Sequence, residues 1–98
     1  MGLKTITIEE IYLNELTNSN NWDELSKQYE LSEEIIEEFS DKINWEYISA
    51  YQHLSESIIR KYPDKVNWTL ISQYQKLSES FMKEFTDRID WYFVKRKI

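Results

Sequence analysis

Apolar residues recur along the chain with a fixed period, and one tryptophan marks each period. The tryptophans stand 23 residues apart, at Trp22, Trp45, Trp68 and Trp91, and no unit carries an insertion. Strict self-similarity of this kind is typical of a stacked repeat array, in which each unit buries its apolar face against its neighbours.

Each unit contains the signals for two short helices. The first, helix A, follows an Asn or Asp whose side-chain oxygen can accept from the free amides of the first turn. The second, helix B, follows a Ser and a Glu, and it ends at an aromatic residue; Pro63 prevents a longer helix B in the second full unit. The cap residues are Asn21, Asn44, Asn67 and Asp90 for helix A, and Ser32, Ser55 and Ser78 for helix B. Helices of about eight residues are unstable alone, so stacking must hold them.

The predicted fold is therefore all-α, an α-solenoid of stacked two-helix repeats. The whole chain is expected to form one repeat domain, with an N-terminal capping half-repeat at 7–21, full repeats at 22–44, 45–67 and 68–90, and a C-terminal half-repeat at 91–98. These segments give about eight short helices.

The two ends depart from the full unit in different ways. Thr7 and Glu10 have the T-x-x-E spacing of a capping box, which predicts a helix at the N-terminal end. That helix resembles a helix B without its helix A, and its apolar residues are Ile8, Ile11, Tyr12, Leu13 and Leu16. At the other end, a helix A stands without its helix B, so we expect Trp91, Val94 and Ile98 to be less covered.

Composition agrees with a single helical domain and narrows the function classes. The chain is 41% hydrophobic and 15% aromatic, with one Gly, one Pro and no Cys. The lack of cysteine excludes a disulfide framework, and no apolar run has the length of a membrane span. We therefore expect a cytoplasmic protein. The formal net charge of −6 argues against direct binding to nucleic acid, which depends on clustered Lys and Arg.

The repeat pattern N/D-W-x-x-[IL]-S-x-Y-Q-x-L-S-E is clearest at residues 44–66 and 67–89. It resembles the Trp-anchored short helical repeats found in proteins of bacteriophages and giant DNA viruses. The resemblance covers roughly residues 21–98, and it implies a viral or phage origin, with interference with a host component as a natural role. Unit one departs from the pattern, because Gln28-Tyr29 stands where later units have Tyr-Gln.

Positions that repeat in every unit are needed for folding, so candidate function lies where the units differ. The second position after Trp holds Tyr47, Leu70 and Phe93, which should line up along stacked helices A, and Tyr51 and Tyr74 lie one turn further on the same face. This aromatic stripe is the preferred protein-binding surface. The alternative is that these side chains pack between neighbouring helices A and only stabilise the array.

A second candidate surface is acidic. Residues 22–44 carry eight acids and two bases, whereas residues 91–98 are basic. The acidic patch comprises Glu30, Glu33, Glu34, Glu37 and Glu38. It could dock on a basic groove as a mimic of nucleic acid, or it could be a solvated helix face that keeps the protein soluble. The opposite charges of the two ends also allow head-to-tail assembly.

Catalytic residues are not evident. The single histidine, His53, stands where other units have Glu30 and Lys76, so we expect it at the surface. The recurring Ser26, Ser49 and Ser72 suggest close approach of helices rather than nucleophiles, and Gln52 and Gln75 are expected to satisfy backbone groups at the turn between helices A and B. No glycine-rich phosphate loop or H-E-x-x-H helix is present, and paired glutamates without loop geometry make a poor metal site. We expect no cofactor and no metal.

Three hypotheses for function remain. The first is a non-enzymatic module that binds a host protein, such as a defence component, through the helix A face. The second is an acidic nucleic-acid mimic that blocks the basic groove of a host defence nuclease, of the anti-restriction or anti-CRISPR type. The third is a structural module that assembles with further copies of itself.

Overall fold

Short helices account for most of the chain in the computed structural model, which describes residues 4–17 and 21–96. Eight helices lie in these ranges, and the all-α class is confirmed. The helices are α1 (Ile8–Leu16), α2 (Trp22–Gln28), α3 (Glu33–Glu38), α4 (Trp45–Tyr51), α5 (Glu56–Lys61), α6 (Trp68–Tyr74), α7 (Glu79–Glu84) and α8 (Trp91–Arg96).

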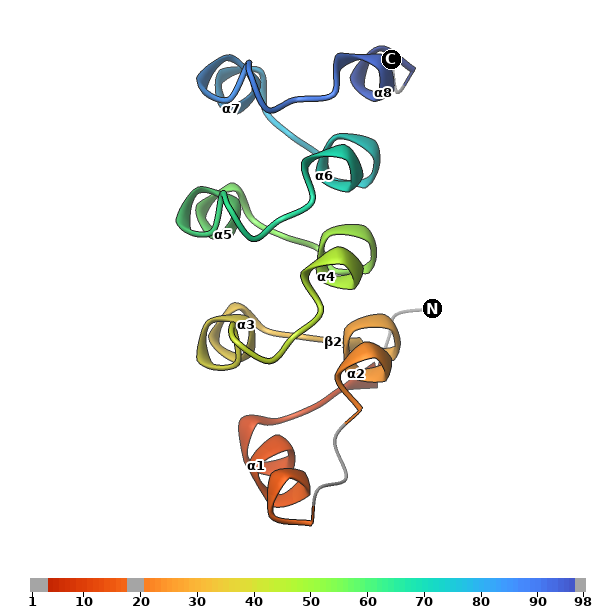
Figure 1. Cartoon of the computed structure of the whole chain (residues 1–98), viewed down its shortest axis with the longest axis vertical. Coiled ribbons are helices and arrows are strands. Elements are labelled where there is room, and N and C mark those ends of the chain that lie inside the picture. Colours follow the sequence, from red (N-terminus) through yellow and green to blue (C-terminus); the bar gives the residue numbers. More distant parts are fainter. Residues whose placement is uncertain (1–3, 18–20, 97–98) are drawn as a thin grey trace.

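The helices stand in two columns (Figure 1). Helices A (α2, α4, α6 and α8) lie one above another in what we call the A column, and adjacent members contact each other. Helices B (α3, α5 and α7) form the B column, with α1 next to α3 at its N-terminal end. The molecule measures 44 × 27 × 16 Å, so it is an elongated and rather flat array.

The caps predicted from the sequence are confirmed. Thr7 and Glu10 form the complete capping box of α1. The other predicted cap residues each accept a hydrogen bond from a backbone amide in the first turn of their helix, and they are Asn21, Asn44, Asn67, Asp90, Ser32, Ser55 and Ser78. Each cap satisfies an amide that the helix itself cannot pair, which fixes where these short helices begin.

In the three full units the tryptophan of helix A packs against the aromatic residue that ends helix B. The Trp45 ring lies 5.0 Å from the Tyr62 ring, and its indole Nε1 donates to the Ser40 carbonyl oxygen over 2.9 Å. Trp68 repeats both contacts with Phe85 and Pro63. Trp22, Trp45 and Trp68 are half-buried, and Trp91 is exposed. The best-buried apolar side chains are instead Ile11, Ile36, Ile48, Ile58, Ile59, Ile71 and Phe81. The tryptophans therefore hold helix A on helix B at the edge of the core.

Buried glutamines join each unit to the unit before it. The side-chain amide of Gln52 donates to the carbonyl oxygens of Ser26 and Tyr29 over 2.8 and 2.7 Å, and its Oε1 accepts from the Leu31 amide over 2.9 Å. Gln75 makes the same three bonds one unit later. The expectation that these glutamines satisfy backbone groups at the A–B turn is confirmed, with the addition that the turn belongs to the preceding unit.

Unit one has Tyr29 at the glutamine position, and the structure gives the reason. Here the backbone of β2 (Tyr29–Glu30) pairs in parallel with β1 (Lys4–Thr5). Main-chain hydrogen bonds from the N-terminal segment therefore take the place of the glutamine side chain. This pairing could not be predicted from the sequence, because two-residue strands carry no periodic signal.

The two ends differ in how their apolar residues are covered, and one expectation needs correction. In α1 only Ile11 is fully buried, whereas Leu13 and Leu16 are exposed, because α1 contacts the array on one side alone. At the C-terminal end Trp91 is exposed as expected, but Val94 is buried, so the prediction for Val94 was wrong. Ile98 lies outside the described residues.

Candidate functional site

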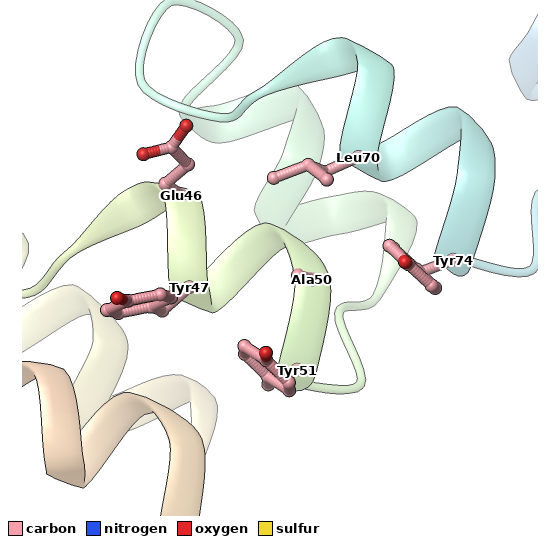
Figure 2. Close-up of a pocket in the computed structure, with 6 residues that line it drawn as sticks. All are labelled: Glu46, Tyr47, Ala50, Tyr51, Leu70 and Tyr74. Atoms are coloured by element: carbon pink, nitrogen blue, oxygen red, sulfur yellow. The ribbon is translucent and has the colours of Figure 1, made fainter.

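A groove of about 440 Å³ opens on the A column between α4 and α6. Its lining residues are Glu46, Tyr47, Ala50, Tyr51, Leu70 and Tyr74 (Figure 2). A volume of this size falls in the range of ligand pockets in proteins, about 300–1,000 Å³. We call this feature the A-column groove.

Four of the five residues of the predicted aromatic stripe meet in this groove, namely Tyr47, Tyr51, Leu70 and Tyr74. Tyr51 and Tyr74 are 52% and 58% exposed, whereas Tyr47 and Leu70 are half-buried. The stripe therefore has two parts: the positions nearer the tryptophan pack between helices, and the positions one turn later stay in solvent. Phe93 lies on α8 and is half-buried, with its ring 5.3 Å from that of Tyr92. Phe93 does not line the groove.

Two lining residues, Glu46 and Ala50, were not selected from the sequence. The position of Ala50 holds Lys27 in the preceding unit and Gln73 in the following one, so a small residue stands between two long ones. The small side chain of Ala50 leaves space between α4 and α6. Comparing side-chain volumes between units would have found this signal, whereas comparing hydrophobicity did not.

The groove is polar at one end and aromatic at the other. Figure 2 shows Glu46 at the start of α4, while Tyr51 and Tyr74 project from the ends of α4 and α6. The Tyr47 and Tyr51 rings are 5.9 Å apart, and the Lys27 ammonium lies 5.2 Å from the centroid of the Tyr47 ring. The groove thus combines ring faces, an apolar floor and a carboxylate.

The glutamates of the predicted acidic patch lie mostly along the B column. Three of them bond within the chain: Glu37 pairs with Lys61 over 3.2 Å, Glu33 accepts from the Ser55 hydroxyl, and Glu38 accepts from the Tyr12 phenol. The hydrogen bond to Glu38 raises the pKa of Tyr12, and desolvation and the carboxylate charge act in the same direction.

The remaining two glutamates of the patch, Glu30 and Glu34, are exposed. Neither has a side-chain hydrogen bond or ion pair with another residue in the ranges 4–17 and 21–96. The acidic patch is therefore divided between carboxylates that join neighbouring units and carboxylates that face solvent.

The groups that could support chemistry are placed as follows. His53 is exposed, as expected. Ser26, Ser49 and Ser72 are fully buried, and the Ser49 hydroxyl is bonded to backbone on both sides, which leaves no room for a substrate. Within residues 4–17 and 21–96, no three His, Cys, Asp or Glu side chains come together as a metal site, and none of the helices has both the length and the apolar character needed to cross a bilayer.

Comparison with known proteins finds no matching family model, no matching curated protein and no matching solved structure. A function for this chain has to be argued from its own groove and surfaces.

Proposed function

We propose that this protein is a non-enzymatic binding module that takes up a partner protein on the A-column groove. The observation that carries the proposal is the exposure of Tyr51 and Tyr74 on the rim of a concave site. Tyrosines present a large rigid surface with a polar tip, and they are enriched among the residues that dominate binding energy at protein interfaces. Because Tyr51 and Tyr74 are more than half exposed, we expect their rings to contribute little to stacking.

The nature of the partner follows from the repeat type. The resemblance to phage and giant-virus repeats favours a host protein, such as a defence component, as the partner, and the host cytoplasm as the compartment. An acidic nucleic-acid mimic is the weaker candidate. Mimicry needs a continuous face of free carboxylates, whereas Glu33, Glu37 and Glu38 are engaged between units.

The proposal is tested by capture from a bacterial lysate, followed by mass spectrometry. The Tyr51→Ala, Tyr74→Ala double variant should lose proteins that the wild type retains, with an unchanged circular dichroism spectrum and melting temperature. The half-buried Tyr47 and Leu70 are less suitable for substitution, because their loss also disturbs packing. The matched control is Leu13→Ala with Leu16→Ala, which removes exposed apolar area from α1 and should leave capture intact. Equal losses in both variants would contradict a specific site on the A column.

A further inference from the structure

The repeat itself shows what kind of group fits between successive helices A. One unit before the A-column groove, the equivalent space lies between α2 and α4, and there the position of Ala50 is taken by Lys27. Lys27 is half-buried, and its ammonium lies over the Tyr47 ring, 5.2 Å from the centroid. A cation at this distance is attracted by the negative face of the ring. The chain thus places a basic side chain of its own in this space.

In the A-column groove Ala50 stands at the position of Lys27, so the internal cation is missing. Leu70 stands at the position of Tyr47, so this part of the floor is aliphatic. Ala50 is too short to reach across to α6, and the rings of Tyr51 and Tyr74 stand on either side of the opening (Figure 2). The floor is formed by Ala50 and Leu70. A long side chain from outside can therefore occupy the position that Lys27 takes one unit earlier.

The charge of the groove also selects a cation. Asp23, the equivalent of Glu46, accepts a hydrogen bond from the side-chain amide of Asn44 over 2.9 Å. Glu46 is exposed, and within the part of the chain that the structure describes, no hydrogen bond or ion pair engages its carboxylate. The groove therefore offers a negative charge that the protein itself does not neutralise.

The length of the groove distinguishes among basic ligands. From Glu46 to Tyr51 the rise along α4 is five residues, or about 7.5 Å. A side chain entering between the tyrosines must cross this distance over an apolar floor before it reaches the carboxylate. Arginine and lysine both have a stem that can lie on apolar surface with the charged head beyond it. Arginine fits better, because its planar guanidinium at the far end bonds a carboxylate with two parallel donors, whereas the lysine ammonium acts as a point charge.

We propose that the A-column groove takes an arginine side chain of the partner protein, with its stem over Ala50 and Leu70 and its guanidinium group at Glu46. This inference rests on the proposed function and specifies the chemistry of the same site. The partner is accordingly a protein that presents an exposed arginine on a convex or extended segment.

The test uses the full chain and N-acetyl-arginine-N-methylamide, titrated while the NMR signals of the Tyr51 and Tyr74 rings are followed. The neutral comparison compound is N-acetyl-citrulline-N-methylamide, which has nearly the same shape. We expect saturable shifts with the arginine compound and about tenfold weaker binding of the citrulline compound, since a charge-assisted hydrogen bond is roughly twice as strong as a neutral one. A third compound, N-acetyl-lysine-N-methylamide, should bind more weakly than the arginine compound. Equal binding of the arginine and citrulline compounds, or equally tight binding of the lysine compound, would overturn the proposed arginine site.

Two variants sharpen the test. Ala50→Lys restores the lysine of the preceding unit, so it should fold normally and weaken binding of the arginine compound about tenfold, by filling the groove from within. Glu46→Gln should weaken binding to a similar extent, whereas the matched control Glu30→Gln, which removes the same charge at an exposed site elsewhere, should not. If Ala50→Lys leaves binding unchanged, or if Glu46→Gln and Glu30→Gln behave alike, the arginine site is wrong.

Failure of this inference is distinguishable from failure of the proposed function. If the arginine compound does not bind but the Tyr51→Ala, Tyr74→Ala variant still loses a captured protein, the groove binds protein by other contacts. If the compound binds as expected but that variant loses no protein, the groove chemistry stands and the protein-binding function falls.

Discussion

Neighbouring units are joined by different chemistry in the A column and in the B column. In the A column the buried joining groups are uncharged: Gln52 and Gln75 bond the backbone of the preceding unit, and the Ser49 and Ser72 hydroxyls accept from the backbone amides of Asn67 and Asp90, the cap residues of the next helix A. In the B column the joining groups lie at the surface, and most of them are ions. The pairs between successive units there are Glu15–Lys42, Glu37–Lys61, Asp41–Lys65, Arg60–Glu84 and Asp64–Arg88.

The difference shows which contacts between units contribute most to the stability of the array and which contribute little. A buried backbone group that loses its partner costs about 1–3 kcal/mol, whereas an exposed ion pair contributes roughly 0–1 kcal/mol. The A column therefore fixes the distance between units, and the B column can vary in sequence. This agrees with the internal pattern, because the serines at 26, 49 and 72 are identical while the charges in helices B change sign between units.

The largest effect is expected for Gln52→Met. The substitution keeps the length of the side chain but leaves the carbonyls of Ser26 and Tyr29 and the amide of Leu31 without their partner, so we expect a loss of about 3 kcal/mol in the free energy of unfolding. Urea denaturation measures this loss of stability. Gln73→Met is the control, since Gln73 is half-buried and makes no side-chain hydrogen bond with the residues that the structure describes; it should change stability by less than about 0.5 kcal/mol. Similar losses in the two variants would contradict the role assigned to the glutamines.

Ser49→Ala should have the next largest effect. The hydroxyl donates to the Trp45 carbonyl oxygen over 2.7 Å and accepts from the Asn67 amide over 2.9 Å. Its removal leaves that amide unpaired at a junction, and we expect a loss of about 1–2 kcal/mol, read from the same denaturation curves. Ser57→Ala in α5 removes an exposed hydroxyl of the B column and should be nearly neutral. A neutral Ser49→Ala would show that the A column tolerates an unpaired amide.

A smaller effect is expected for Glu37→Gln, which breaks the ion pair with Lys61. Both side chains are about half exposed, so we expect a change of about 0.5 kcal/mol that disappears in 1 M salt. Glu34→Gln, on the same helix, removes an exposed carboxylate and serves as the control. A loss above about 2 kcal/mol for Glu37→Gln would remove the distinction between the two columns.

The smallest effect is expected for Tyr12, at the N-terminal end of the B column, whose contribution to stability should decrease at alkaline pH. The hydrogen bond to Glu38 raises the pKa of Tyr12 in the folded state. The contribution of this bond to stability is therefore complete below the ordinary tyrosine pKa of about 10, and it is lost as the pH rises through the higher pKa of the folded state. The stability difference between wild type and Tyr12→Phe should therefore be constant below that pH and decrease above it. Melting temperatures of both proteins across the alkaline range provide the measurement. A difference that grows with pH would contradict the raised pKa.

Much of the fold could be predicted from the sequence, because the signals are local. A cap residue acts on amides three positions away, so Asn44 or Ser55 marks the start of a helix without reference to the rest of the chain. The stripe residues Tyr47, Tyr51, Leu70 and Tyr74 were also predicted to share a face, since equivalent positions of stacked units align. Phe93 lies outside the groove, because alignment of positions does not determine which junction leaves a groove open.

The sequence by itself determined the period, the caps, the all-α class and the face on which the variable aromatic residues lie, since each of these follows from spacing along the chain. Only the tertiary structure decided that β1 pairs with β2 where unit one has Tyr29 in place of the glutamine, that Leu13 and Leu16 stay exposed while Val94 is buried, and that Ala50 opens a groove with Glu46 unpaired at its end. These outcomes depend on residues 20 or more positions apart meeting in space, where the result is set by volume and by which polar groups remain unpaired.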